Sequence, residues 1–470
     1  MERKRKNYGI YILMLLVFGG LIYGALHTGE RFLTSGLPEV TGRLRETAFG
    51  MFRGIILDNL RSPLTVLLFQ VIVILLFVRL FSRLFRYIGQ PGVIGEIVAG
   101  IVLGPSVLGI LSPELFGALF PQESLTNLEL LSQIGLVLFM FVIGMDVDFG
   151  ILKNKMHETL VISHAGIIVP FFLGIVASFW VYEEYASQQT DFLPFALFIG
   201  ISMSITAFPV LARIIRERGI GGSSVGVLAI ASAANDDVTA WCLLAVVIAV
   251  AEAGSLLSAL YTVGLAIAFI VVMFCIVRPF LRRVGDKHVG LEGAGGGFVG
   301  SVFLVLLISS VATEIIGIHA LFGAFVAGVV MPPHEAFRRG MVEKVEDVAL
   351  VFFLPLFFAF TGLRTEIGLL DTPALWGACA LLIVVAVLGK LGGCSLAARA
   401  VGESWRDSLT LGTLMNTRGL MELVALNIGY EMGVLPPQIF VILVLMALST
   451  TFMTTPLLRL VERLFHTHHR

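Results

Sequence analysis

The sequence has little charge, few cysteines and no long polar segment. Only 14% of its 470 residues are charged and 57% are hydrophobic, whereas a soluble protein carries about 25% charged residues. The net charge is −1, so no basic excess points to nucleic acid. The four cysteines lie in apolar runs without a C-x-x-C spacing, which is typical of buried small side chains. No nucleophile–base set or metal-ligand spacing indicates an enzyme, and we expect no cofactor.

Long apolar runs dominate the chain instead. Many of them reach the roughly 20 residues that a bilayer-spanning helix needs, and they predict an all-α polytopic membrane protein. Before the first run stands MERKRK, and no small-residue cleavage site follows it, which favours a retained helix over a cleaved signal peptide. Fourteen spans are predicted, at residues 8–26, 62–80, 91–110, 129–149, 158–182, 193–215, 223–252, 256–278, 297–313, 317–332, 347–364, 373–398, 408–429 and 436–460.

Lysine and arginine clusters fall between alternate spans. By the positive-inside rule, this places both termini in the cytoplasm, and we expect the protein in the cell's inner membrane. Residues 1–61 are predicted to hold a helix and an extracytoplasmic loop, although five arginines in 27–61 fit that side poorly. The antiparallel run of spans occupies 62–460, and 461–470 is predicted to be a short cytoplasmic tail.

Short motifs recur in the same order in the two halves of the chain. VAGIV returns as VAGVV, LFMFVIGMDVD as LFFAFTGLRTE, and SITA loosely as MNTR. The matches predict a repeat of six spans, 62–252 and 297–460. One span, 256–278, joins them and would invert the second copy in the membrane. Inverted repeats are typical of secondary transporters, although glycine- and alanine-rich helices also resemble one another by composition alone.

Two adjacent acids, Asp236 and Asp237, lie in the middle of span 223–252 beside Asn235. Neighbours on a helix point about 100° apart, so the two carboxylates cannot share one partner. Ionised groups at this depth are costly and mark functional sites. A proton, a metal cation or Lys390, the lysine deep in span 373–398, can neutralise them. The alternative is a plain buried ion pair with Lys390 or Arg418.

Two further spans contain helix-breaking residues at equivalent positions of the repeat. The first holds Pro209 shortly after Ser204 and Thr206, and the second holds Asn416 and Arg418 ahead of Glu422. Proline removes a helical hydrogen bond, and clustered glycine, asparagine and threonine weaken a helix. Interrupted helices at matching positions are the best sequence indication of a transporter site, whereas one kinked helix alone has no such meaning.

Six segments together resemble the monovalent cation/proton antiporter superfamily, in its branch with the plant cation/proton exchangers and their bacterial relatives. They are QPGVIGEIVAGIVLGPSVLG, SITAFPVLARII, AANDDVTAW, GIHALFGAFVAGVVMP, LPLFFAFTGLRTEIG and LMNTRGLMELVALNIG, from residue 90 to residue 429. The resemblance implies the sodium/proton antiporter fold, with two inverted six-helix repeats and crossed interrupted helices. It also implies a dimerisation domain and hence a homodimer. The helix at 8–26 lies outside this pattern.

The resemblance also assigns roles to residues. It implies that Asp237, with Asp236 and Thr206, binds the cation or proton, and that Lys390 is the charge partner of Asp236. The site would be supported by a second group of residues: Asn235, Ser204, Asn416, Arg418 and Glu422. The implied function is exchange of Na⁺ or K⁺ for protons across the bilayer, electrogenic because of Lys390. The alternative is a potassium channel-like efflux pathway.

Overall fold

The computed structural model describes residues 17, 18, 20, 22, 24, 48–146, 156–185, 190–253, 256–288, 296–332, 345 and 347–466. Ten helices in these ranges are long and apolar enough to cross a membrane, as an all-α polytopic protein requires. The chain divides into two compact units, residues 1–62 and 63–470. In the first unit, α2 (Ala48–Leu60) is the one complete helix among the described residues.

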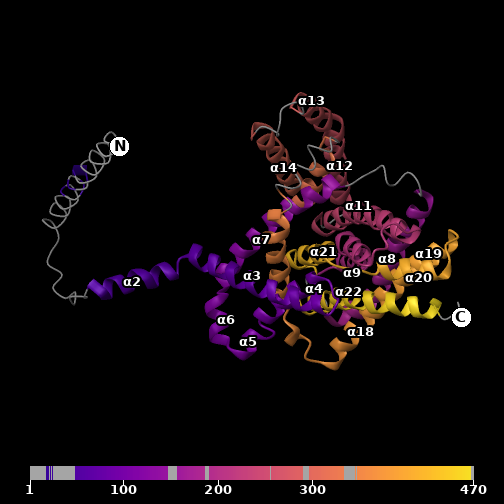
Figure 1. Ribbon diagram of the computed structural model, residues 1–470, viewed down its shortest axis with the longest axis horizontal. Helices are drawn as coiled ribbons and strands as arrows, with labels where there is room; N and C mark the ends of the chain where they lie inside the picture. The colour runs from indigo at the N-terminus through magenta and orange to yellow at the C-terminus, as the bar shows by residue number, and fades with distance from the viewer. Residues whose placement is uncertain are drawn as a thin grey trace, which may run out of the picture. The chain divides into compact units, whose positions relative to one another are not determined.

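The larger unit contains two helix bundles (Figure 1). Bundle A is built from helices of both halves of the chain, which pack most extensively on one another. It comprises α3 (Pro63–Tyr87), α4 (Gly92–Leu103), α5 (Leu108–Leu111), α6 (Pro113–Leu119), α7 (Gln122–Asp146), α14 (Gly296–Ile316), α15 (Ala320–Val329), the π-helical turn η3 (Ala349–Phe353) and α17 (Leu354–Arg364).

Bundle B also takes helices from both halves. Its members are α8 (Met156–Tyr185), α9 (Phe192–Ser204), α10 (Phe208–Glu217), α11 (Ser224–Ala253), α18 (Pro373–Val387), the π-helical turn η5 (Leu388–Gly392), α19 (Gly393–Ala400), α20 (Trp405–Met415), α21 (Leu420–Glu431) and α22 (Pro437–His466). The short 3₁₀ turn η4 (Ile367–Leu369) follows bundle A and precedes α18.

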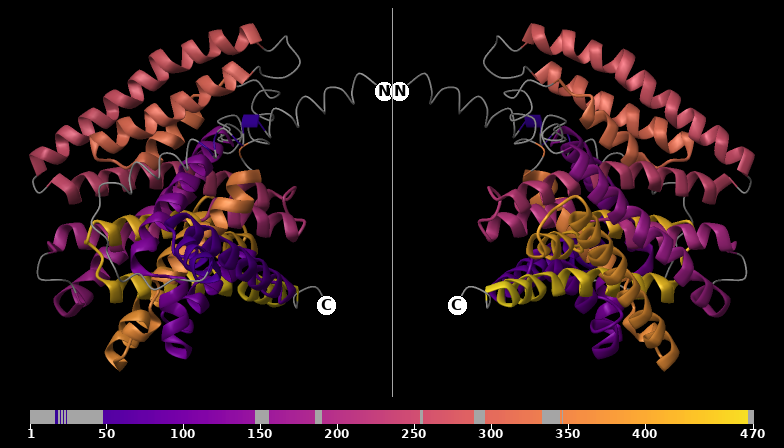
Figure 2. Two further views of the ribbon diagram at one scale, coloured as in Figure 1. Left: turned by 90° about the vertical axis from the view of Figure 1, so that its left-hand side faces the viewer. Right: turned by 90° about the vertical axis from the view of Figure 1, so that its right-hand side faces the viewer.

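A long rod joins the two halves of the sequence. It consists of α12 (Leu256–Val272), the π-helical turn η2 (Met273–Val277) and α13 (Arg278–His288). Figure 2 shows this rod beside α14. Its span has little buried surface within the chain, so most of its apolar side chains face outward, toward lipid or another protein.

Glycine pairs bring the helices of bundle A into close contact. A Cβ atom on Gly100 of α4 would lie 2.1 Å from the Ala359 oxygen of α17, and one on Gly362 would lie 2.2 Å from the Ile97 oxygen. Small residues let helix backbones approach in this way inside membranes, where packing rather than the hydrophobic effect drives association. Bundle A is therefore tightly packed along the α4–α17 contact.

The structure confirms the two predicted helix interruptions and changes three other expectations. Span 193–215 breaks between α9 and α10, and span 408–429 breaks between α20 and α21. The expected loop 27–61 contains helix α2, because residues 48–60 include a largely apolar helix-forming stretch. The stretch SPELFG, residues 112–117, falls in the gap between the predicted spans 91–110 and 129–149, yet it lies mostly in α6, where Pro113 occupies the first helical turn that tolerates proline.

The third change concerns the linking span, which continues beyond residue 278 as α13. Most of the predicted span 8–26, like the tail beyond residue 466, lies outside the described residues. The inverted relation between the two six-span repeats stays a prediction.

Candidate functional site

The two helix breaks contact each other in the interior of bundle B. The Ala207 N–H donates to the Thr417 oxygen at 2.9 Å, and the Thr206 hydroxyl donates to the Met415 oxygen at 3.1 Å. All four of these residues are buried. Both breaks therefore satisfy part of their exposed backbone polarity by pairing with each other, which buried backbone groups require.

Local sequence explains where each break falls. Pro209 lies in the first turn of α10, where its missing N–H has no helical partner to lose. In the second break, Gly419 precedes α21 and Asn416 follows α20. These weak helix formers end one helix and begin the next.

The free carbonyl groups at the carboxyl end of α9 accept hydrogen bonds from two buried positively charged side chains. Arg418 donates to the oxygens of Ser202 and Met203, each at 2.6 Å, and Lys390 donates to the Ser204 oxygen. The last carbonyls of a helix have no internal partner and carry partial negative charge. Lys390 and Arg418 therefore neutralise the end of this half-helix.

The acid pair lies on the other side of the same break, with the two residues in different environments. Asp236 accepts from Lys390 Nζ at 2.8 Å and from the Thr206 N–H at 3.1 Å, both through Oδ2. Neither Asp237 oxygen accepts a hydrogen bond of normal geometry from the described residues. The backbone N–H of Phe208, in the first turn of α10, lies near the Asp237 carboxylate, where helix polarity favours an anion.

Lys390 lies in a π-helical turn, η5, and is completely buried. Its ammonium donates to Asp236, to the Ser204 oxygen, and to the Gly166 oxygen at 2.7 Å. All three of its donors are thus used. A π-turn is a rare distortion that is frequent at functional sites, and the run LGKLGG gives it a flexible sequence.

Three oxygen-bearing groups at the crossing are buried and lack hydrogen-bond partners among the described residues. They are both oxygens of Asp237, Oδ1 of Asp236, and the side-chain amide of Asn416. Asn416 directly follows Met415, whose carbonyl contacts Thr206. Unwound backbone and buried carboxylates of this kind are the ligands that transporters offer to monovalent cations and protons.

The remaining predicted residues have other contacts. Asn235 donates to Ser163 of α8 at 2.9 Å. The Ser204 hydroxyl donates to carbonyls of Gly200 and Ile167. Arg418 also pairs with Glu422 at 3.3 Å, and both side chains are fully buried.

The structure therefore gathers Asp236, Lys390 and the Thr206 backbone into one network. Arg418 binds the end of α9 and pairs with Glu422, and Asn235 binds Ser163 of α8.

Several contributing residues gave no sequence signal. Thr451 of α22 accepts the Arg418 N–H at 3.0 Å and donates to the Arg418 oxygen at 2.7 Å. Gly166 accepts a hydrogen bond from Lys390 through its carbonyl oxygen and leaves room for Cys394, because a Cβ atom there would lie 2.7 Å from Cys394 Sγ. A threonine and a glycine are ordinary in membrane helices, so spacing alone does not single them out.

Two broken helices that cross around buried charges define the class of this protein, a secondary membrane transporter. Comparison with known proteins gives the family. The protein-family model described as "Sodium/hydrogen exchanger, transmembrane" matches residues 72–460. The Na⁺/H⁺ antiporter NhaS4 of Synechocystis sp. is 42% identical over 401 residues, which cover 84% of this chain and 97% of that relative. The chain belongs to the sodium/hydrogen exchanger family, whose members are cation/proton antiporters.

Two eukaryotic relatives are longer. Cation/H⁺ antiporter 17 of Arabidopsis thaliana is 41% identical over 88% of this chain, and K⁺/H⁺ antiporter 1 of Saccharomyces cerevisiae is 34% identical over 86%. The matches span 50% and 47% of those two proteins. The chain thus corresponds to about half of each.

A solved structure shows the shared fold. The sodium proton antiporter MjNhaP1 of Methanocaldococcus jannaschii superposes with a TM-score of 0.65, over 85% of this chain and 99% of that one, at 15% identity. The predicted superfamily and the antiporter fold are both confirmed.

Proposed function

We propose that the protein exchanges Na⁺ or K⁺ for protons by alternating access, with Asp237 as the ion-binding residue. The observation that carries the proposal is the contrast inside the acid pair. Asp236 is held by Lys390, whereas Asp237 is buried without an ion pair in the described part of the chain. A buried carboxylate without a counter-ion is stable only when it binds a proton or a cation.

Competition for Asp237 couples the two fluxes. A cation that enters the crossing is bound by the Asp237 carboxylate, with the Asp236 Oδ1 and Asn416 as further oxygen ligands. A proton on Asp237 removes the charge that holds the cation. Because the site binds either a cation or a proton, a full transport cycle carries a cation across the membrane in one direction and protons in the other.

Lys390 makes the exchange electrogenic in this proposal. Without cation, its ammonium pairs with Asp236; cation binding at the acid pair breaks that pair and releases a second proton from Lys390. Two protons then cross for one cation, so each cycle moves one net charge. Arg418 and Glu422 hold the crossing in shape rather than carry the ion.

Names of relatives support both cations. NhaS4 is named for Na⁺ and the yeast relative for K⁺, and oxygen ligands suit either. We further propose an inner-membrane homodimer with both termini cytoplasmic, in which bundle B moves as a rigid body against bundle A.

A flux assay with sealed liposomes tests the proposal. The purified protein is reconstituted with an internal pH dye, and Na⁺, K⁺ or Li⁺ is added outside. Exchange predicts a cation-dependent internal alkalinisation that also responds to a clamped membrane potential. Cation currents without obligatory proton movement would support the channel-like alternative, and absence of any cation-driven pH change would reject the antiporter.

A further inference from the structure

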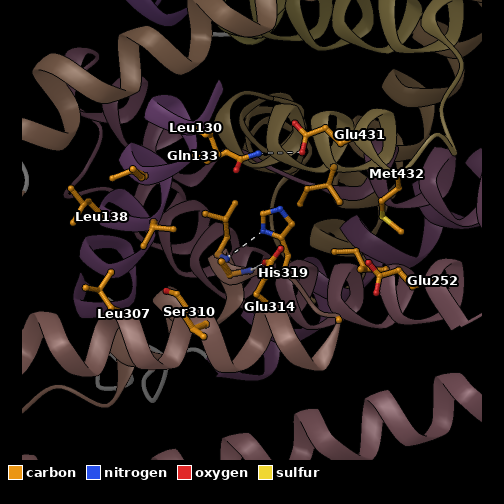
Figure 3. Close-up of a pocket in the computed structure, with 18 residues that line it drawn as sticks. Leu130, Gln133, Leu138, Glu252, Leu307, Ser310, Glu314, His319, Glu431 and Met432 are labelled. Carbon is orange, nitrogen blue, oxygen red and sulfur yellow. Dashed lines mark hydrogen bonds between the residues drawn. The ribbon is translucent and has the colours of Figure 1, made fainter. Parts of the chain in front are cut away.

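A cavity of about 620 Å³ lies between the two bundles, away from the helix crossing. Bundle A contributes α7, α14 and α15 to its walls, and bundle B contributes the ends of α11 and α21. Figure 3 shows Gln133, Glu252, Glu314, His319 and Glu431 around it. The charge pattern assigns these helix ends to the extracytoplasmic side.

Two of the cavity's carboxylates have no lysine or arginine partner among the described residues. Glu252 lies near the end of helix α11 and is exposed. Its Oε2 atom contacts the turn after α14, since a Cβ atom added to Gly317 would lie 2.6 Å from this oxygen. Glu314 is exposed and accepts the Ala320 N–H at 2.7 Å. The two carboxylates come from opposite bundles and repel each other electrostatically.

The other charged groups leave the cavity negative. Arg364 pairs with Glu129 and Glu431, at 2.5 and 2.9 Å, so this cluster adds no net positive charge to the cavity. The Nδ1 atom of His319 accepts the Leu321 N–H at 3.4 Å, which requires an unprotonated nitrogen there. Carboxylates beside low-dielectric walls focus the field and concentrate cations.

An unpaired hydroxyl points to a ligand inside the cavity. Ser310 lines the wall from α14, is only 5% exposed, and its Oγ has no hydrogen-bond partner in the described ranges. Figure 3 shows its side chain rising from α14 into the cavity. A buried hydroxyl without a partner costs free energy, which a bound water or cation removes.

The cavity ends well short of the acid pair. Ile248 and Glu252 of α11 line it, and Glu252 lies about 22 Å along the helix from Asp237 at 1.5 Å per residue. Trp241, one turn beyond Asp237, stacks on Phe325 of α15 at 6.5 Å. These aromatic rings belong to opposite bundles, and Trp241 lies on α11 between Asp237 and the first residue of that helix that lines the cavity, Ile248.

We infer that the cavity is a second cation site, which collects the transported monovalent cation at the extracytoplasmic side before the bundles move. Glu252 and Glu314 attract the ion, and Ser310 provides an inner oxygen ligand. The volume admits a cation with part of its water shell, since each water occupies about 30 Å³. The inference rests on the proposed function and adds a side-specific step to it.

Sided transport kinetics test the inference. Exchange driven by added Na⁺ or by added K⁺ is measured in right-side-out and inside-out vesicles, for wild type and the Glu252→Gln/Glu314→Gln variant. We expect the variant's half-saturating cation concentration to rise about threefold to tenfold from the extracytoplasmic side only. Salt is expected to shrink the difference, because the Debye length falls from about 10 Å at 0.1 M to 3 Å at 1 M.

Two further variants sharpen the result. Glu114→Gln/Asp371→Asn removes the same charge from exposed positions outside the cavity, and is expected to match wild type on both sides. Ser310→Ala is expected to raise the extracytoplasmic half-saturation about threefold to fivefold with little salt dependence, because it loses a short-range contact.

The outcomes separate this inference from the proposed function. Unchanged kinetics in the Glu252→Gln/Glu314→Gln variant, or an equal change on both sides, overturns the cavity site while wild-type exchange stands. If wild type exchanges neither cation for protons, the proposed function is wrong, and the cavity site is rejected with it. If the Glu252→Gln/Glu314→Gln variant has the same kinetics as wild type from the cytoplasmic side, the variant is folded.

Discussion

At the scale of single residues, the site depends on two buried charges that share one hydrogen-bond network. Asp236 and Lys390 are both completely buried, 2.8 Å apart. Removing one member of such a pair costs about 3–5 kcal/mol, because it leaves the other charge uncompensated, whereas removing both is often neutral. The Asp236–Lys390 pair therefore contributes little net stability, but the loss of either member is strongly destabilising.

This asymmetry gives a prediction for paired substitutions. Lys390→Met is expected to lower the melting temperature in detergent, or to force a proton onto Asp236. The double variant Asp236→Asn/Lys390→Met is expected to recover most of the loss, and to exchange cations without response to a clamped membrane potential. A double variant that melts no higher than Lys390→Met would contradict the account of the pair.

At the scale of elements, the crossing is held by backbone groups that helix breaks leave free. Arg418 caps α9, and Thr451 of α22 binds both the N–H and the oxygen of Arg418. The second broken helix is thus anchored to a continuous neighbour as well as to the first break. Its position depends on hydrogen bonds made outside its own helices.

Thr451→Val tests that anchoring. Valine keeps the shape but leaves two buried backbone groups without partners, at a cost of about 1–3 kcal/mol each. Thr450→Val is the matched control, because the Thr450 hydroxyl bonds only to carbonyls of its own helix. We expect thermal unfolding of Thr451→Val at a clearly lower temperature than Thr450→Val. Equal melting temperatures would show that the contact does not hold the break.

Sequence predicted the elements of the site better than its distant contacts. Asp236, Lys390 and the two breaks stand out because charges and proline are rare in apolar spans. The Arg364 cluster does not, since Glu129, Arg364 and Glu431 each lie at or just beyond the end of a predicted span, where charged side chains are ordinary. Only the packing of α7, α17 and α21 brings them within hydrogen-bond distance. Helix α2 was not predicted, because residues 27–61 contain five arginines and were assigned to a loop.

At the scale of the whole molecule, a cluster of polar side chains around Arg364 joins the two bundles. Arg364 of bundle A binds Glu129 in its own bundle and Glu431 of bundle B, and its guanidinium lies 4.4 Å from the Phe360 ring. Rigid-body motion of bundle B changes the contacts of Arg364 with Glu431 and Asn427, whereas the Arg364–Glu129 pair lies within bundle A and can persist.

Chemical cross-linking distinguishes these two pairs. In a background without the exposed Cys242 and Cys275, Arg364→Cys is combined with Glu431→Cys or, as a control, with Glu129→Cys. A short reversible thiol cross-linker is expected to stop exchange only in the pair that joins the bundles, and its removal is expected to restore exchange. Full exchange by the cross-linked Arg364–Glu431 variant would contradict relative motion at this face.

The most direct measurement is cation-driven proton flux through Asp237→Asn in liposomes, beside wild type and the exposed-site control Asp371→Asn at equal reconstitution. Asparagine keeps the shape of the side chain, but its amide carries no negative charge, so it neither takes up a proton nor neutralises a bound cation. The account predicts that wild type and the control alkalinise the lumen on addition of Na⁺ or K⁺, while Asp237→Asn produces no cation-dependent change. Exchange by Asp237→Asn at the wild-type rate would contradict the central claim that this carboxylate carries the ion.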